Sequence, residues 1–492
     1  MERSSGIILP VFSLPSEYGI GTLGREAYAF ADFLHSAGQK YWQMLPLGPT
    51  SFGDSPYQSF STFAGNPYFI DLRMLIDDGL LYESELHGID WGDDPRYVDY
   101  AKIYDARLGV LRLAYQRGFE RDRTEVCAFE EENRGWLPAY AEFMAIKRFF
   151  GMRAWTEWDE DIRRREPDSL GRYRTLLKDD IGLFTYIQFL FYRQWDKLKS
   201  YVNSLGISVI GDLPIYVAFD SADVWAEPGY FCLDEDLLPT EVAGVPPDYF
   251  CADGQLWGNP LYDWDKMRAD GFGWWIRRVD GAKKLYDLIR IDHFRGFEKY
   301  WAVPYGDKTA KNGRWRPGPG MELVKVLTGW FYGLGFIAED LGVPSEGLRR
   351  LLDDSGLPGM RVLEFAFDGL SESPYQMHNY SENCVCYTGT HDNSPIAQWY
   401  REIPQEELEY AVEYMGLNDR EGICRGMLRC GMGSVARLFV AQMQDWLGLG
   451  EGHRTNAPGT VGGNWRWRLI PGEINAELAE DILHITKLYG RA

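Results

Sequence analysis

Short apolar runs that alternate with segments of helical period restrict the fold of this chain more than any other feature. The runs are bounded by turn-forming residues and lie at 6–14, 41–47, 207–217, 288–294, 336–341, 360–367, 384–392 and 464–470. Segments with a helical period lie between many of them, at 24–38, 274–289, 321–335 and 434–448. Alternating strands and helices predict a parallel sheet. Eight such units predict an α/β fold, namely a closed (β/α)8 TIM barrel.

The uneven spacing of the runs predicts a distorted barrel with large inserted subdomains. The second and third runs are separated by far more than one helix, so we expect residues 48–206 to form a mainly helical insertion. Residues 218–273 are rich in Pro, Gly, Asp and Tyr, which predicts a loop-rich insertion that covers the active site. Residues 471–492 are enough for one helix and too few for a C-terminal β-sandwich. We expect residues 1–492 to form a single barrel with these insertions.

Charge and cysteine content narrow the classes of partner. Lys and Arg number 51 against 73 Asp and Glu, which gives a net charge of −22. Nucleic acids and anionic membrane surfaces attract basic proteins, so neither is an expected partner. The 7 cysteines form no CxxC pair, the start MERSSGIILPVFSLP lacks a signal-peptide pattern, and no apolar run is long enough to span a bilayer. We therefore expect a cytoplasmic protein.

Acidic residues follow four of the predicted strands. Asp212, Asp292, Glu339 with Asp340, and Asp392 stand at the ends of VIGDLP, LIRIDHF, FIAED and YTGTHDN. In a (β/α)8 barrel the carboxyl ends of the strands form one rim, where active sites lie. Any one of these acids is more simply explained as a helix cap or as part of a local ion pair. Four acids at equivalent strand ends favour a shared site.

Three kinds of chemistry commonly use clustered carboxylates. Divalent metals need several oxygen ligands, phosphoryl transfer needs a metal and a phosphate-binding loop, and glycosidic cleavage needs a nucleophilic carboxylate and a carboxylic acid. The sequence contains no GxxxxGK[ST] and no HExxH, and the acidic residues 234–236 lie in a polar segment that predicts a solvated turn. We therefore expect no metal and no cofactor. Glycosidic cleavage also accounts for the 15% aromatic residues, which stack on sugars, although a Trp-rich core explains them equally well.

The neighbours of the acids predict different protonation states. Arg290 and Asp292 share one face of a strand, so charge pairing is expected to keep Asp292 ionised, as a nucleophile requires. Glu339 follows the apolar FIA, where desolvation is expected to raise its pKa and keep it protonated, as a general acid requires. Asp392, beside His391, is placed to stabilise a sugar cation or to orient hydroxyl groups.

These segments resemble a known enzyme family. LIRIDHFRG, FIAEDLG and YTGTHDN resemble the nucleophile, acid/base and third-acid segments of the α-amylase clan. Three longer motifs, SFGDSPYQSFSTFAGNPYFIDL, GVPPDYFCADGQLWGNPLYDW and APGTVGGNWRWR, resemble the 4-α-glucanotransferases (amylomaltases or disproportionating enzymes) of glycoside hydrolase family 77. The resemblance covers nearly the whole chain. It implies a distorted (β/α)8 barrel with inserted subdomains and no C-terminal β-sandwich, and a reaction on α-1,4-glucans and maltooligosaccharides.

The resemblance also implies roles for individual residues. Asp292 would attack the anomeric carbon, and Glu339 would protonate the departing oxygen and then act as base toward the 4-hydroxyl of an acceptor glucan or glucose. Asp392 would be the third acid. The implied substrate-binding residues are Tyr57, stacked on the sugar at the cleavage point, Asp212, Arg290 and His391, which would hold hydroxyl groups, and Asp248, Gln255 and Trp257, in a loop that grips the acceptor.

Three alternatives remain open at the level of sequence. An α-glucan hydrolase on the same barrel would use the same acids and differ only in what deglycosylates the intermediate. A non-catalytic glucan-binding protein would retain the fold without turnover, and a metal-dependent phosphotransferase would need a phosphate loop that the sequence lacks. Tyr97, Tyr100 and Tyr104 are candidates for a second glucan-binding surface, but tyrosines at near-helical spacing are more often core residues.

Overall fold

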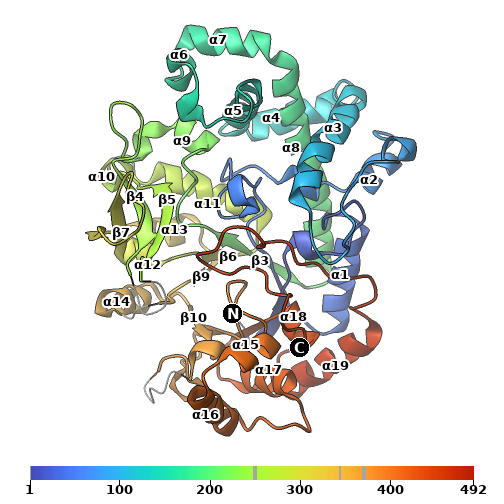
Figure 1. The fold of residues 1–492 in the computed structure, drawn as a ribbon, viewed down its shortest axis with the longest axis vertical. Helices are drawn as coiled ribbons and strands as arrows, with labels where there is room; N and C mark the ends of the chain where they lie inside the picture. The colour runs from blue at the N-terminus through green and yellow to red at the C-terminus, as the bar shows by residue number, and fades with distance from the viewer. Residues whose placement is uncertain (1, 248–251, 343–344, 368–372) are drawn as a thin grey trace.

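The computed structural model describes residues 2–247, 252–342, 345–367 and 373–492, and they form a closed parallel β-barrel surrounded by helices (Figure 1). The strand order around the barrel is β1-β12-β11-β10-β9-β6-β3-β2. The barrel strands are β1 Ser4–Ile8, β2 Tyr41–Gln43, β3 Ser208–Leu213, β6 Leu288–Ile291, β9 Gly335–Ala338, β10 Gly359–Val362, β11 Cys384–Tyr387 and β12 Leu438–Gln442. This architecture confirms the predicted (β/α)8 fold class.

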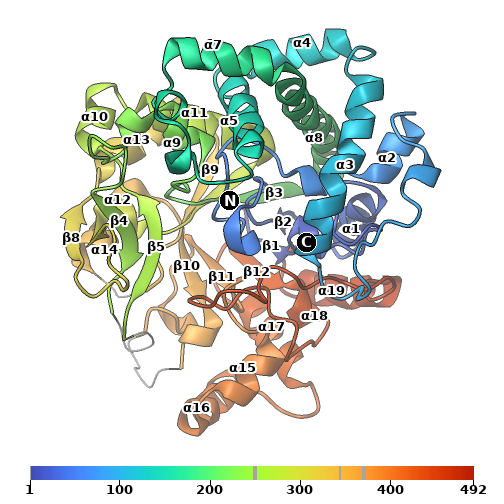
Figure 2. The same cartoon turned by 45° about the horizontal axis from the view of Figure 1, so that its top comes forward.

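The eighth strand differs from the prediction. Residues 464–470 were expected to supply it, yet that segment forms only an isolated bridge, Tyr97 with Trp467. The strand is β12, which lies inside the predicted helix 434–448 and is followed by the short helix α18, Met443–Trp446. The run LFVAQM suits either a buried helix or a buried strand, and pairing with β1 and β11 decides between them by closing the barrel (Figure 2).

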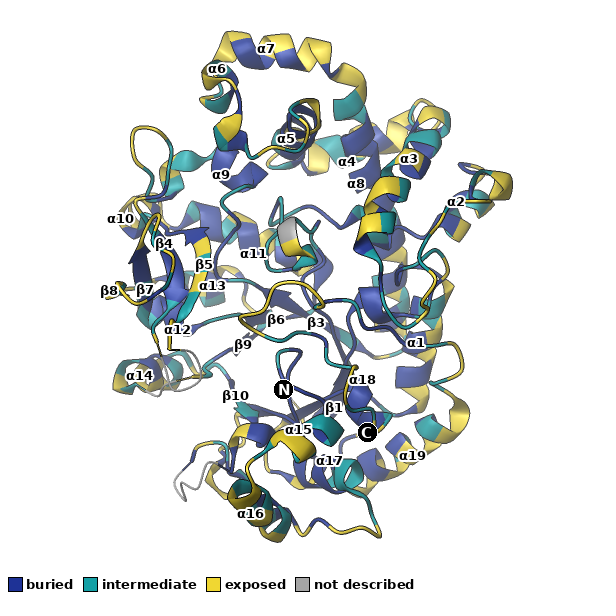
Figure 3. Cartoon of the chain, in the orientation of Figure 1, coloured by how far each residue is buried: buried dark blue, intermediate teal, exposed yellow. Residues whose placement is uncertain are grey.

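The strands are apolar on both faces because side chains fill the barrel and helices cover it. Inward residues such as Leu288, Ile337 and Leu438 form one buried cluster, and outward residues such as Ile289 and Ile291 join the larger core beneath the helices. Figure 3 shows the barrel strands buried, while α7 and α16 expose one side. This alternation also puts Arg290 on the inner face of β6.

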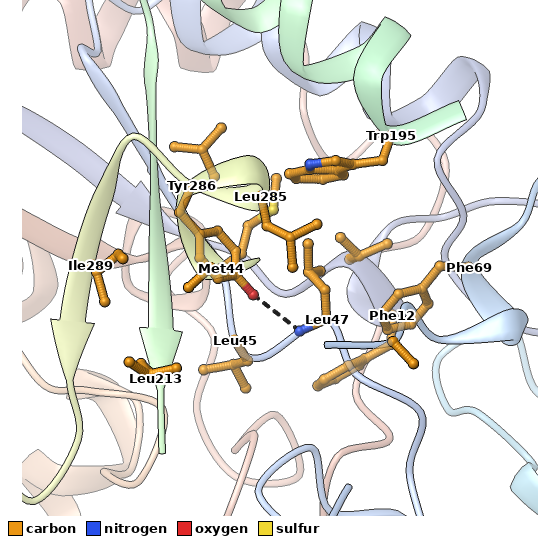
Figure 4. Close-up of a cluster of buried hydrophobic side chains, with 14 of the residues drawn as sticks. Phe12, Met44, Leu45, Leu47, Phe69, Trp195, Leu213, Leu285, Tyr286 and Ile289 are labelled. Carbon is orange, nitrogen blue, oxygen red and sulfur yellow. Dashed lines mark hydrogen bonds between the residues drawn. The ribbon is translucent and has the colours of Figure 1, made fainter. Parts of the chain in front are cut away.

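The outer layer beside β3 and β6 shows how the helices fix these strands. Figure 4 shows Trp195 from α8 beside Leu285 at the end of α11, and Leu213 and Ile289 of the two strands belong to the same buried cluster. The hydroxyl of Tyr286 accepts a hydrogen bond from the backbone N–H of Leu47 at 3.2 Å, which satisfies a buried donor within this layer.

The segment between β2 and β3 forms a helical layer at one end of the barrel (Figure 1). Helix α1, Arg25–Ser36, precedes β2. The segment itself contains α2 Leu72–Asp77, α3 Tyr100–Gly118, α4 Arg123–Glu132, α5 Leu137–Phe149, α6 Glu160–Arg163, α7 Pro167–Leu176 and α8 Lys178–Ser204. Helix α8 crosses this layer, packs on α3, α4, α5 and α7, and leads into β3.

A small antiparallel sheet stands beside the barrel, with strand order β5-β4-β7-β8. Its strands are β4 Glu241–Val245, β5 Gln255–Pro260, β7 Lys299–Pro304 and β8 Arg314–Pro317. Residues 218–273 were expected to be loop-rich, and they contain β4 and β5 together with the helices α9 Ala222–Ala226 and α10 Trp264–Ala269. Sequence composition missed this sheet because β4 pairs with β7, which comes from beyond β6.

The remaining helices follow the barrel strands. They are α11 Gly273–Leu285, α12 Arg295–Glu298, α13 Met321–Trp330, α14 Glu346–Ser355, α15 Ile396–Glu402, α16 Gln405–Met415, α17 Ile423–Gly433 and α19 Ala476–Leu488. In residues 373–492, which the structure describes without a gap, only α18 and α19 follow β12, and no β-sandwich is present. Among the described residues, no helix has the length and apolar character required to cross a membrane.

Candidate active site

Three adjacent barrel strands, β3, β6 and β9, and a fourth, β11, which lies beyond β10, bring the predicted acids to one edge of the barrel. Asp212 lies in β3, Asp292 follows β6, Glu339 follows β9, and Asp392 lies in the loop after β11. Backbone hydrogen bonds continue past the strand ends: Asp292 N–H donates to Leu213 O at 3.0 Å, and Glu339 N–H donates to Ile291 O at 3.1 Å. The hydrogen-bonding pattern of the sheet therefore extends to the backbone of Asp292 and Glu339.

Arg290 joins two of these acids inside the barrel. Its Nη1 donates to both carboxylate oxygens of Asp212 at 2.7 Å and to Oδ1 of Asp292 at 3.0 Å. Arg290 and Asp212 are almost fully buried, at 3% and 2% exposed. A buried charge requires a partner, and these contacts supply one to each group. The contact between Arg290 and Asp292 follows from their shared face of β6.

Tyr57 links this cluster to the loop after β11. Its hydroxyl donates to Oδ2 of Asp212 at 2.8 Å and lies 2.8 Å from Nε2 of His391. The Tyr57 and His391 rings stack with centroids 5.3 Å apart. Burial lowers the pKa of His391, so its imidazole is neutral at pH 7. Because the single hydroxyl proton of Tyr57 goes to Asp212, the Nε2–H of His391 donates to the tyrosine oxygen.

Glu339 is buried and bound by backbone N–H groups. Oε2 accepts a hydrogen bond from His293 N–H at 2.7 Å, and Oε1 accepts one from Leu341 N–H at 2.9 Å. Burial raises the pKa of Glu339 above its usual value, as the apolar neighbours predicted, although the two N–H donors and Arg290 oppose the shift.

The pKa of Asp292 corrects one expectation. Charge pairing with Arg290 was expected to dominate, but burial outweighs it and raises the pKa to about 8, with Asp212 and Glu339 adding to the rise. The reason is that Arg290 pairs with two carboxylates, so the negative charge of Asp212 offsets part of the effect of Arg290 on Asp292. Asp292 and Glu339 therefore titrate together, and the pair retains a proton near neutral pH.

Asp392 lies at the open side of the site, with 41% of its side chain exposed. Asn456 Nδ2 donates to Oδ1 of Asp392 at 2.6 Å, and His391 Nε2 lies 3.4 Å from the same oxygen. Arg454 donates to the backbone oxygen of Asp392. Sequence reasoning missed Asn456 and Arg454. Their position directly before the APGTVGGNWRWR motif was the available signal.

The small sheet brings a further pair of predicted residues to the barrel rim. Gln255 and Trp257 lie on one face of β5, and Nε1 of Trp257 donates to Oε1 of Gln255 at 3.1 Å. The Trp257 ring meets the ring of His293 edge to face, with centroids 4.9 Å apart. His293 is the residue directly after Asp292 in the chain. Asp248 lies outside the described residues.

A family model described as 4-alpha-glucanotransferase, of glycoside hydrolase family 77, matches residues 9–472. The chain belongs to this family. It is 46% identical over 483 residues to the 4-alpha-glucanotransferase of Clostridium butyricum, covering 98% of this chain and 99% of the relative. It is 47% identical over 493 residues to the 4-alpha-glucanotransferase of Streptococcus pneumoniae, covering 100% of this chain and 98% of the relative. These matches confirm the resemblance seen in the motifs.

Solved structures agree with the family assignment. The amylomaltase from Streptococcus agalactiae in complex with acarbose matches with a TM-score of 0.97 and 44% identity over 100% of both chains. The amylomaltase from Corynebacterium glutamicum, at 19% identity and a TM-score of 0.77 over 99% of this chain and 74% of that one, shares the fold. The family assignment gives glucan transfer as the reaction class and does not favour a simple hydrolase.

The three tyrosines considered for a second glucan-binding surface differ in their surroundings in this 4-α-glucanotransferase family member. Tyr100 is buried, and its hydroxyl donates to Trp465 O at 2.7 Å. The Tyr97 hydroxyl donates to Gly452 O at 2.8 Å, and Tyr104 is 50% exposed. Tyr100 and Tyr97 thus fasten α3 and the preceding turn to the C-terminal segment, which leaves Tyr104 as the exposed member of the set.

Proposed function

We propose that the protein moves an α-1,4-glucan segment from a donor to the 4-hydroxyl of an acceptor glucan or of glucose, through a covalent glucosyl-enzyme intermediate. Family membership supports the reaction class. One observation carries the residue assignment: Arg290 holds Asp292 at the end of β6, beside the buried Glu339 at the end of β9. A nucleophilic carboxylate and a carboxylic acid are the two groups that retaining glycosyl transfer requires.

In the first half of the reaction, Asp292 attacks the anomeric carbon of the donor sugar. Arg290 occupies Oδ1. Oδ2 forms no hydrogen bond with any part of the chain that the structure describes, and it is the oxygen proposed to attack. As the C–O bond to the enzyme forms, the glycosidic bond breaks and its electron pair leaves with the departing glucan oxygen.

Glu339 supplies the proton that the departing oxygen needs. Burial raises the pKa of both acids, so the pair retains one proton near neutral pH. We assign that proton to Glu339 in the reactive form, because Arg290 donates directly to Oδ1 of Asp292 at 3.0 Å. Once the glucan leaves, Glu339 is ionised, and its two N–H donors stabilise that form. It then takes the proton of the acceptor 4-hydroxyl while that oxygen displaces Asp292.

The remaining predicted residues surround the donor sugar. Tyr57, His391 and Asp212 form one hydrogen-bonded chain, and Asp392 is held by Asn456 with part of its carboxylate exposed. We propose that Asp392 binds hydroxyls of the donor sugar and that the Tyr57 ring packs against it. Buried hydrogen-bonded groups of this kind favour the strained sugar of the transition state over the ground state.

The acceptor side is assigned to β5. Transfer must exceed hydrolysis although water is abundant, which requires a bound acceptor and a dry reaction site. Gln255 and Trp257 present a polar group and a flat ring beside His293, a combination suited to a sugar. Asp248 is proposed to join them, as the family motif implies.

Maltooligosaccharides are the proposed substrates, in agreement with the acarbose complex of the relative from Streptococcus agalactiae. We place the protein in the cytoplasm, a location supported by the unpaired cysteines of the described chain, for example the buried Cys384 and Cys386, because thiols persist in a reducing compartment.

The test is incubation with maltotriose, with two readouts: the number of reducing ends and the distribution of chain lengths. Each bond that transfer breaks is remade, so glucose and longer oligomers should accumulate while the reducing-end count stays constant. A rising count with only glucose and maltose as products would indicate a hydrolase. No product at all would indicate a binding protein.

A further inference from the structure

His293, the residue after Asp292, has an unusual backbone conformation. Its φ is +49°, in the left-handed region that side chains rarely adopt. Asn, Asp and His are the residues other than glycine that most often tolerate it, whereas β-branched residues do so least. Such a conformation persists only where surrounding contacts hold it. Two of the contacts at His293 lead to the active site, one to Glu339 and one to Trp257.

The turn directs two successive N–H groups toward Glu339. His293 N–H donates to Oε2 at 2.7 Å, and Phe294 N–H donates to the backbone oxygen of Glu339 at 3.0 Å. Glu339 N–H donates in return to Ile291 O at 3.1 Å. Three hydrogen bonds thus join the end of β6 to the residue that bears the proposed acid. Because φ sets the direction of the chain after the N–Cα bond, an ordinary negative φ at residue 293 would turn the Phe294 N–H away from the backbone oxygen of Glu339. It would thereby release the turn that keeps the His293 N–H on Oε2.

The side chain of His293 makes a different contact. Its ring meets the ring of Trp257 edge to face at 4.9 Å. Burial lowers the pKa of the imidazole to about 4, so the ring is neutral at pH 7 and acts here as a flat packing surface. The same residue therefore touches the proposed acid through its backbone and the proposed acceptor side through its ring.

We propose that His293 is a positioning residue with two separable parts: its left-handed backbone holds the turn that keeps its N–H group on the Glu339 carboxylate, and its ring holds Trp257 beside the reaction site. The inference rests on the acid/base role proposed for Glu339. The N–H group stabilises the carboxylate form, which Glu339 must adopt between the two half-reactions. The ring contact fixes the face of β5 that the acceptor meets.

The experiment compares His293→Asn with His293→Val. Both substitutions remove the imidazole, but asparagine tolerates a positive φ and the β-branched valine does not. On maltotriose, kcat should fall by about tenfold or more in His293→Val and by less than about threefold in His293→Asn. General acid–base catalysis contributes about 10²- to 10⁴-fold in total, and a displaced N–H donor removes only part of it. Both variants should raise the hydrolysis-to-transfer ratio by the same factor, since both lack the ring.

The pH profile separates positioning from a merely structural effect. Loss of the N–H donor destabilises the Glu339 carboxylate and raises its pKa. The limb of the kcat/KM profile that reports this group should therefore move to higher pH in His293→Val and stay in place in His293→Asn. Identical kcat values and profiles in the two variants would overturn the backbone part, and an unchanged product ratio would overturn the ring part.

Two controls keep the outcomes distinct. Glu339→Gln is measured in parallel: if it retains turnover, the acid/base assignment fails and the inference fails with it. If Glu339→Gln is inactive, the asparagine and valine variants alone decide the role of His293. Should His293→Val not fold by circular dichroism, His293→Ala and His293→Gly make the same comparison, because neither has a ring and only glycine is free at positive φ.

Discussion

The barrel rim and the small antiparallel sheet meet at one site but hold their residues in different ways. On the rim, Arg290 and Asp212 are buried and form several charged hydrogen bonds. On β5, Gln255 and Trp257 are half-buried, and one hydrogen bond joins their side chains. A rigid, low-dielectric rim suits groups that must react with fixed geometry. A lighter, partly exposed sheet suits an acceptor that enters and leaves. Substitutions on the rim should therefore affect turnover, and those on the sheet should affect the choice of acceptor.

The largest effect is expected for the proposed nucleophile. Asp292→Asn should lower kcat for both transfer and hydrolysis by about four orders of magnitude or more, because an amide does not form the glycosyl ester at a useful rate. Chromatography of the products formed from maltotriose measures this loss of activity. Asp265→Asn, at a carboxylate 97% exposed, is the matched control and should remain fully active. Substantial turnover by Asp292→Asn would remove Asp292 from the nucleophile role.

The next effect tests the ion cluster. Arg290→Met leaves the buried Asp212 and the partly buried Asp292 without their shared cation, which should lower the free energy of unfolding by about 3–5 kcal/mol. The pKa of Asp292 should rise further, so less of it is ionised at a given pH, and the acid limb of the kcat/KM profile should move to higher pH. Urea unfolding and pH–rate profiles measure the two effects.

A double variant sharpens the same prediction. Asp212→Asn added to Arg290→Met removes one of the two unpaired carboxylates and should restore part of the lost stability. An acid limb that stays at the wild-type pH in Arg290→Met would show that Arg290 does not influence ionisation of the nucleophile.

A smaller effect, mainly on the ratio of products, is expected for Trp257 of the small antiparallel sheet. Trp257→Ala should raise the hydrolysis-to-transfer ratio by about threefold to tenfold, the equivalent of one lost aromatic contact, while total bond cleavage changes less. Reducing-end release against chain elongation measures the ratio. Leu256→Ala is the matched control, because Leu256 directly precedes Trp257 and lies on the opposite, exposed face of β5. Equal ratios in the two variants would remove Trp257 from the acceptor site.

The smallest effect concerns the sheet itself. Glu241 of β4 pairs with Arg314 and Arg316 of β8, two arginines that are 66% and 41% exposed. Glu241→Gln should lower the free energy of unfolding by only about 0.5–1 kcal/mol, because pairs with solvent-exposed partners contribute little. Denaturant unfolding measures it, and the product ratio should not change. A loss comparable to that of Arg290→Met would show that the sheet is not held more loosely than the rim.

Local patterns predicted one contact and one pKa shift of the candidate site. A strand with period two puts Arg290 and Asp292 on one face, and the structure places them in contact. The apolar residues before Glu339 predicted its raised pKa. The prediction for Asp292 was incomplete, because a pairwise argument from sequence does not reveal that Arg290 also serves Asp212, a residue 78 positions away.

Patterns that suit two structures were decided only by long-range pairing. Residues 434–448 have a helical period, but β12 forms there because the edges of β1 and β11 require a partner. The alternating NWRWRLI resembles a strand, yet it runs along the N-terminal segment, where Leu469 N–H donates to Ser13 O. In both cases the local pattern suited more than one structure. The segments that decided between the structures lie far away in the chain.

The sequence by itself determined the fold class, the family and the four strands that carry acids. Each of these depends on residues close together in the chain, either as apolar runs or as contiguous family motifs. The tertiary structure decided which strand closes the barrel, how β4 and β5 find β7, and that Asn456 supports Asp392. It also decided that Arg290 divides its charge and that His293 adopts a positive φ. These features arise from contacts between distant segments, and their free energies depend on burial that only the folded chain creates.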